Sequence, residues 1–142
     1  MKKMYESKLG RAIFVRLSEN EDLLEAITLR AKNSKITTGF FILIGVLKKA
    51  VVGFYSQGKY QNIEIDGPLE ILSCTGNVSL KEQEPFVHAH ISVANEKGEA
   101  FGGHVLPGCI VSVTGELILI DAPDVKLQRK LDKGTKLYLW EA

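Results

Sequence analysis

The sequence contains little cysteine and almost no excess of charge of either sign. Its 142 residues include two cysteines, Cys74 and Cys109, and the formal net charge at pH 7 is +1. The near-neutral charge gives no global attraction to nucleic acid, so a DNA-binding role would need a local basic patch. Both cysteines lie in apolar, strand-like segments without an evident secretory signal, and we expect buried reduced thiols rather than a disulfide.

Long hydrophobic runs are also missing. The longest apolar run covers residues 40–47, whereas a membrane-spanning helix needs roughly 20 apolar residues. The N-terminal lysines are followed by Tyr5, Glu6, Ser7 and Lys8, which interrupt the apolar core that a signal peptide requires. We therefore expect a cytoplasmic protein with no membrane partner.

Common signatures of nucleotide and hydrolytic chemistry are absent. The sequence has no phosphate-binding P-loop and no dinucleotide fingerprint, and no Gly-x-Ser-x-Gly nucleophile elbow. A basic cluster lies near the C-terminus, but aspartates dilute it and few aromatics are interleaved for base stacking. We interpret this cluster as solvated surface; it consists of Lys126, Arg129, Lys130, Lys133 and Lys136.

Length and composition predict one domain over residues 1–142, because 45% hydrophobic and 25% charged residues are ordinary for a globular chain that buries a core. One amphipathic helix follows Ser18, which we expect to be its N-cap, with Glu21 completing a capping box. Its apolar residues recur at helical spacing, which favours packing on a sheet. A second, shorter helix is predicted within residues 122–131.

Most of the remaining sequence has the pattern of strands. The pattern predicts a turn at Lys48-Lys49 and a break at Gly67-Pro68. One helix among many strands indicates an α+β fold with a mostly antiparallel sheet. We expect strands at residues 10–17, 38–47, 50–55, 61–65, 69–77, 86–95, 100–105, 109–120 and 136–140.

The three histidines of the chain lie within seventeen residues, as His88-Ala89-His90 and Gly102-Gly103-His104. Alternate strand residues face the same side, so His88 and His90 should have Cα atoms about 6.5 Å apart on one face. A third histidine from the next strand would give three nitrogen ligands and an open position, as in catalytic zinc sites. The alternative is that each imidazole is hydrogen-bonded within its strand or at a subunit contact.

Two further features bear on this cluster. Glycine in a strand often marks a bulge or a close backbone approach, so Gly102 and Gly103 could redirect His104, although an ordinary turn explains them equally. Glu116 interrupts an apolar strand and is the candidate catalytic acid or base beside a metal. It could equally face solvent or a neighbouring subunit.

Three segments together resemble the PPC domain, also called domain of unknown function 296 or the PD1-like DNA-binding family. They are GPLEILS at residues 67–73, PFVHAH at residues 85–90 and GGHVLPG at residues 102–108. The resemblance implies an α+β fold with a central antiparallel sheet and a homotrimeric assembly. It also implies similarity to the fold of acetolactate decarboxylase and of a zinc-dependent ester hydrolase, whose His-x-His pair and later histidine correspond to His88, His90 and His104.

Plant members of this family carry AT-hooks and use the domain for self-association and partner binding. The corresponding interaction segment is Gly67, Pro68, Leu69, Glu70, Ile71 and Leu72, in which Pro68 and Leu69 replace the usual arginine and phenylalanine. No Arg-Gly-Arg-Pro core occurs here, so the AT-hook route to DNA is absent.

These observations lead to one main hypothesis and two alternatives. The main hypothesis is a homotrimer that binds a divalent metal, zinc, and has a binding, assembly or regulatory role. The first alternative is a DNA-associated transcriptional regulator that lacks an AT-hook. The second is a zinc-dependent hydrolase or decarboxylase acting on a small-molecule ligand with a carbonyl or ester group.

Overall fold

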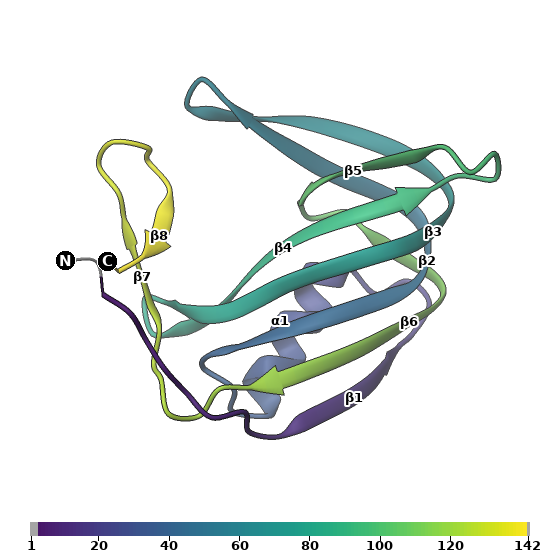
Figure 1. Ribbon diagram of the computed structural model, residues 1–142. Coiled ribbons are helices and arrows are strands. Elements are labelled where there is room, and N and C mark those ends of the chain that lie inside the picture. Colours follow the sequence, from purple (N-terminus) through teal and green to yellow (C-terminus); the bar gives the residue numbers. More distant parts are fainter. Residues whose placement is uncertain (1–2, 142) are drawn as a thin grey trace.

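A computed structural model, which describes residues 3–141, places one helix against a long, curved sheet (Figure 1). The chain order is β1 (Ala12–Leu17), α1 (Leu23–Asn33), β2 (Gly39–Ser56), β3 (Lys59–Lys81), β4 (Glu84–Ala94), β5 (Ala100–Val105), β6 (Ile110–Asp121), β7 (Gln128–Leu131) and β8 (Tyr138–Trp140). All strand pairs are antiparallel except β3 with β7. The α+β prediction is confirmed.

The sheet curls because its two longest strands each serve two sets of neighbours. The first half of β2 pairs with β6 and with the second half of β3, whereas its second half pairs with the first half of β3. The strand β5 joins β4 to the second half of β2, where Gly53 is opposite His104. The chain thus brings β4, β5 and the far end of β2 together around one end of the sheet.

The core lies between α1 and one face of this sheet. Side chains that alternate along β4, namely Val87, Ala89 and Ile91, are buried together with Ala26 and Ile27 of the helix. Because successive strand residues face opposite sides, the side chains between them project from the face that the helix leaves open. We call this second face the open face.

The helix begins later than the sequence predicts. Its N-cap is Asp22, whose carboxylate accepts a hydrogen bond from the Glu25 N–H (3.2 Å). Half of the expected capping box forms, since the Ser18 N–H donates to Glu21 Oε2 (2.7 Å). The residues between Ser18 and the helix are instead held by β6, because the Asn20 N–H donates to the Val111 carbonyl.

Two predicted interruptions and one predicted helix are wrong. Strand β2 continues through Lys48-Lys49 with a local irregularity of register, and β3 continues through Gly67-Pro68. Residues 122–131 form no second helix, because their backbone groups pair with neighbouring segments. The Leu80 N–H donates to the Leu127 carbonyl (2.8 Å), after which β7 pairs with β3 and β8.

Candidate metal centre

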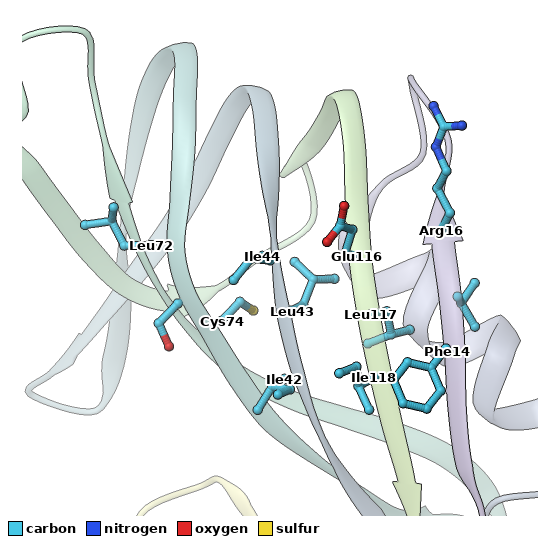
Figure 2. A pocket seen from close by; sticks show the side chains of 12 residues that line it. Phe14, Arg16, Ile42, Leu43, Ile44, Leu72, Cys74, Glu116, Leu117 and Ile118 are labelled. Atoms are coloured by element: carbon cyan, nitrogen blue, oxygen red, sulfur yellow. The ribbon is translucent and has the colours of Figure 1, made fainter.

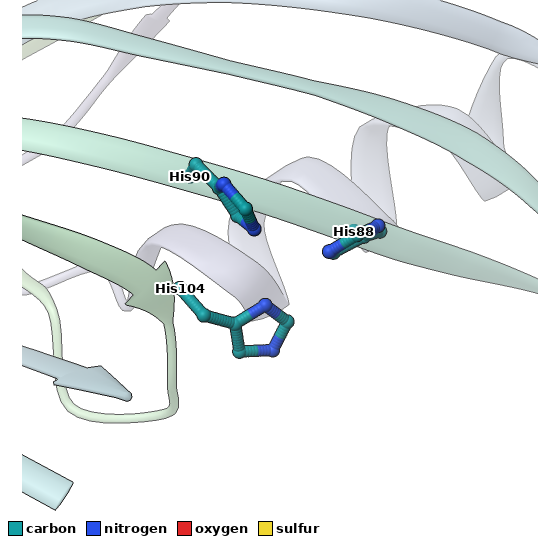
Figure 3. Close-up of side chains that lie close together, drawn as sticks. All are labelled: His88, His90 and His104. Carbon is teal, nitrogen blue, oxygen red and sulfur yellow. The ribbon is translucent and has the colours of Figure 1, made fainter. Parts of the chain in front are cut away.

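The three histidines converge on the open face, and all of them come from one chain (Figure 3). His88 and His90 project from β4, and His104 of β5 is the register partner of His90. The ring centroids lie 5.1 Å apart for His88 and His90, 5.1 Å for His88 and His104, and 5.7 Å for His90 and His104. One nitrogen of each ring lies within 4.8 Å of the other two.

These nitrogens are suited to hold a metal ion. Two nitrogen ligands of one tetrahedral zinc lie about 3.4 Å apart. Small rotations of the histidine side chains would bring the three nitrogens to that separation. His104 Nδ1 is buried and has no hydrogen-bond partner among the described residues. A buried polar atom without a partner is unfavourable, and a bound ion would resolve this when the ring presents that nitrogen.

The surroundings keep two of the imidazoles neutral. Burial lowers the pKa of His88, which reaches about 4 with the added influence of His104, Arg129 and His90. Burial is also the main cause that lowers the pKa of His104, followed by His90 and Arg129. A metal binds neutral imidazole, so these rings are ready to coordinate at neutral pH without first losing a proton.

Close backbone packing fixes the strand that carries His104. A Cβ atom on Gly102 would lie 2.5 Å from the carbonyl oxygen of Ile91 on β4. A Cβ atom on Gly103 would lie 2.9 Å from the carbonyl oxygen of Gly53 on β2. Glycines are therefore needed at these two positions because neighbouring backbones approach them closely, and not because the chain turns there. The His104 ring is also stacked on Tyr60 of β3, with centroids 4.7 Å apart and planes at 25°.

Arg129 is the residue near this site whose place the sequence did not reveal. It belongs to the predicted solvated basic cluster, but its side chain is only 8% exposed. Its guanidinium donates hydrogen bonds to Ser79 Oγ, Asn77 Oδ1 and the Tyr138 carbonyl. One feature of the sequence could have indicated this burial: Leu127 and Arg129 are two residues apart, so in an extended segment they share one side. The neighbouring lysines and aspartates obscured the pattern.

Glu116 lies on the open face but away from the histidines. It is opposite Ile44 of β2 and Arg16 of β1, and its strand β6 is separated from β4 by β2 and β3. Three strand spacings amount to about 14 Å, which separates Glu116 from His88 and His90. His104 is opposite Gly53 of β2, nine residues along that strand from Ile44, the partner of Glu116. Glu116 therefore does not touch the histidine cluster, and it lines an apolar groove elsewhere on the open face.

The apolar groove has a volume of about 700 Å³ and lies across β1, β6, β2 and β3 (Figure 2). We call it the open-face groove. Its exposed apolar side chains include Phe14 (74% exposed), Ile42 (50%), Ile44 (53%) and Leu72 (53%). Arg16 and Glu116 supply its charged side chains.

The predicted interaction segment lies in the middle of β3. Leu69 and Ile71 point into the core, with 1% and 4% exposure, while Glu70 and Leu72 are exposed. Leu72 alone of this segment lines the open-face groove. Both cysteines are buried and free, and burial raises the pKa of the Cys74 thiol to about 12.

A comparison with known families agrees with this architecture. The profile of the Plants and Prokaryotes Conserved domain, abbreviated PCC or PPC, matches residues 4–123. The chain belongs to this family. A crystal structure of a PPC protein from Pyrococcus horikoshii is 37% identical, with a TM-score of 0.91 over 99% of this chain and 97% of that one. A metal-containing protein from Archaeoglobus fulgidus is 32% identical, with a TM-score of 0.89 over 97% and 98% of the two chains.

The PPC domain also occurs as part of a longer protein. The chain is 31% identical over 123 residues to a bifunctional protein GlmU from Synechococcus, and these residues are 85% of this chain but 18% of that protein. Two more distant structures share the fold. One, described provisionally as DNA-binding, comes from Bacteroides thetaiotaomicron (23% identity, TM-score 0.85, 97% of each chain). The other is a Staphylococcus aureus protein similar to alpha-acetolactate decarboxylase (14%, TM-score 0.54, 87% and 56%).

One finding concerns membranes. Within residues 3–141, no helix has the length and apolar character needed to cross a bilayer.

Proposed function

We propose that this PPC protein binds one divalent metal ion, zinc, through His88, His90 and His104, and acts as a homotrimeric binding or assembly module. The observation that carries the metal site is the convergence of three imidazoles within one chain, with nitrogens inside 4.8 Å of one another. The metal-containing relative from Archaeoglobus fulgidus, with 32% identity, supports the same function.

The donor set favours zinc over a hard cation. Three imidazole nitrogens suit zinc and other transition metals, whereas calcium and magnesium prefer oxygen ligands. With three protein ligands one coordination position stays open to water or a ligand. When bound, zinc would supply Lewis acidity or an activated water at that position.

A binding role is favoured over the alternative of a zinc-dependent hydrolase or decarboxylase. Such an enzyme needs an acid or base beside the metal, and Glu116 lies about 14 Å away by strand count. Among the described residues that line the two cavities next to the histidines, none is aspartate or glutamate. Turnover of a model ester that depends on zinc would reverse this preference.

Support for the homotrimer comes from the open-face groove. A monomer seldom exposes a large contiguous apolar patch, and such patches usually contact another protein. Phe14 of β1 and Ile42 and Ile44 of β2 line this groove on either side of β6, whose Ile118 is the register partner of both Phe14 and Ile42. Copies of the same chain are the proposed occupants, in line with the assembly that the family resemblance implies.

The DNA-associated role has less support within this chain. The C-terminal basic cluster is its only internal basis, and Arg129 of that cluster is buried in hydrogen bonds to the protein. The role stays a prediction. DNA binding that weakens steeply with added salt would favour it.

Elemental analysis of purified, tag-free protein tests the metal site. We expect roughly one zinc per chain, and loss of that zinc in a His88→Ala/His90→Ala double variant. Ser73→Ala is the matched control, since Ser73 lies beside His90 in a shared cavity and is not a metal ligand. Failure to retain zinc supplied at neutral pH would overturn the proposed site.

A further inference from the structure

A cavity of about 210 Å³ adjoins the histidine cluster, between the sheet and the β7–β8 hairpin. A cavity of this size has room for several water molecules, which suits a small organic molecule. We call it the Arg129 cavity. It is lined by His88 and His104, by the cations Arg129 and Lys136, and by Tyr60, Phe86, Leu137, Tyr138 and Leu139.

Arg129 is a buried cation without an anionic partner. Its three hydrogen bonds, of 2.7 to 2.9 Å, all go to neutral oxygen atoms. A guanidinium has five N–H donors, so two remain. No carboxylate of the described residues forms an ion pair with it. A buried charge is normally paired, because burying it alone is costly.

The charged residues that line the cavity are all of one sign. Arg129 and Lys136 are positive, and none of the lining residues is acidic. Behind this lining, Tyr138 contacts one further charge of each sign: Lys81 Nζ lies 3.8 Å from the centre of its ring, and its hydroxyl donates to Glu82 Oε1 (3.3 Å). A divalent metal on the three histidines would increase this positive charge. A negatively charged ligand would balance this charge.

We infer that Arg129, assisted by Lys136, is the subsite for the carboxylate of a small organic acid that binds against the histidine cluster. Planar guanidinium matches the geometry of a carboxylate and can donate two hydrogen bonds to it. The apolar walls formed by Phe86, Leu137 and Leu139 favour a ligand with a carbon body over inorganic phosphate. The inference rests on the proposed metal site for the ligand's second contact, while the carboxylate contact is tested separately.

Calorimetric titration with benzoate, in metal-free and in zinc-loaded protein, tests this subsite. Arg129→Met should weaken benzoate binding by about tenfold or more, the loss expected for one charge-assisted hydrogen bond. Lys130→Met is the matched control, because Lys130 lies on the same strand, is exposed and pairs with Glu141 (2.7 Å). Benzamide, which has the same shape without the charge, should not bind, and phosphate should bind more weakly than benzoate.

Arg129 also holds β7 in place, so a second measurement avoids the variant. In the NMR spectrum of the wild-type protein, benzoate should shift the side-chain Nε–Hε signal of Arg129, and benzamide should leave it unchanged. An unmoved signal, or wild-type affinity in folded Arg129→Met, overturns the inference. The same holds if neither benzoate nor acetate binds at millimolar concentration.

The two proposals fail in different ways. Zinc uptake at one per chain without any carboxylate binding overturns the Arg129 subsite and leaves the proposed function standing. Benzoate binding that depends on Arg129 in a chain that takes up no zinc supports the subsite and overturns the proposed metal site.

Discussion

At the scale of single residues, two of the histidines proposed to bind the metal, His88 and His104, have a lowered pKa because they are buried. His88 has its pKa lowered from 6.5 to about 4, mainly by burial. Between these two pH values the unfolded chain binds more protons than the folded chain. The stability of the metal-free protein should therefore fall as the pH is lowered from about 6.5 to about 4. Chemical denaturation across this range measures the effect.

The same prediction has a direct spectroscopic form. In the metal-free protein, the imidazole NMR signal of His88 should titrate with a midpoint near pH 4. His88→Gln removes the titrating group, so that variant should lose less stability on acidification than the wild type. A His88 midpoint near 6.5 would contradict the buried environment described above.

Gly102 offers a second test at this scale. In Gly102→Ala the new Cβ would meet the backbone oxygen of Ile91, which cannot rotate away, so β5 must shift from β4. Overpacking of this kind costs about 1–3 kcal/mol, and it should also weaken zinc binding because His104 moves with its strand. Gly134→Ala is the control, since its Cβ would meet only a side-chain oxygen of Asp132, at 3.3 Å, and no backbone atom. Equal zinc affinity in both variants would show that β5 adapts.

At the scale of elements, the start of α1 depends on one carboxylate. Asp22 caps the helix through the Glu25 N–H and also accepts a hydrogen bond from the Gly108 N–H (2.6 Å), which ties the helix to the segment before β6. Loss of an N-cap costs about 0.5–2 kcal/mol, so Asp22→Ala should lower the urea midpoint. Ser18→Ala should be nearly neutral, because Ser18 contributes its backbone N–H. A larger loss in Ser18→Ala would restore Ser18 as the cap.

The same elements explain what a sequence can and cannot predict. The alternation of apolar residues was sufficient for β5, where the predicted and observed bounds agree, and it placed the three histidines on one face. It failed at Lys48-Lys49, because the continuity of β2 depends on pairing with β3 and β6 rather than on local polarity. Arg129 was missed for the same reason, since its acceptors Asn77 and Ser79 lie about fifty residues earlier in the chain.

At the scale of the whole molecule, assembly and metal binding should be separable. The open-face groove lies over β1, β6, β2 and β3, whereas the histidines come from β4 and β5 of a single chain. If three copies cover their grooves with one another, the ligand set of each copy is still complete. A change in the groove should therefore abolish assembly and leave the zinc content intact.

Ile44→Glu puts this to the test. Ile44 is 53% exposed in the single chain and lies opposite Glu116. A second carboxylate buried there in a trimer would lie beside this like charge, which is strongly unfavourable. Light scattering should give three times the chain mass of 15.7 kDa for the wild type and that mass for the variant. Leu29→Glu, at an exposed helix position outside the groove, should remain trimeric. A monomeric wild type at micromolar concentration would refute the trimer, and a trimeric Ile44→Glu would move the contact to another face. Zinc lost together with the trimer would mean that a neighbouring copy holds the metal in place.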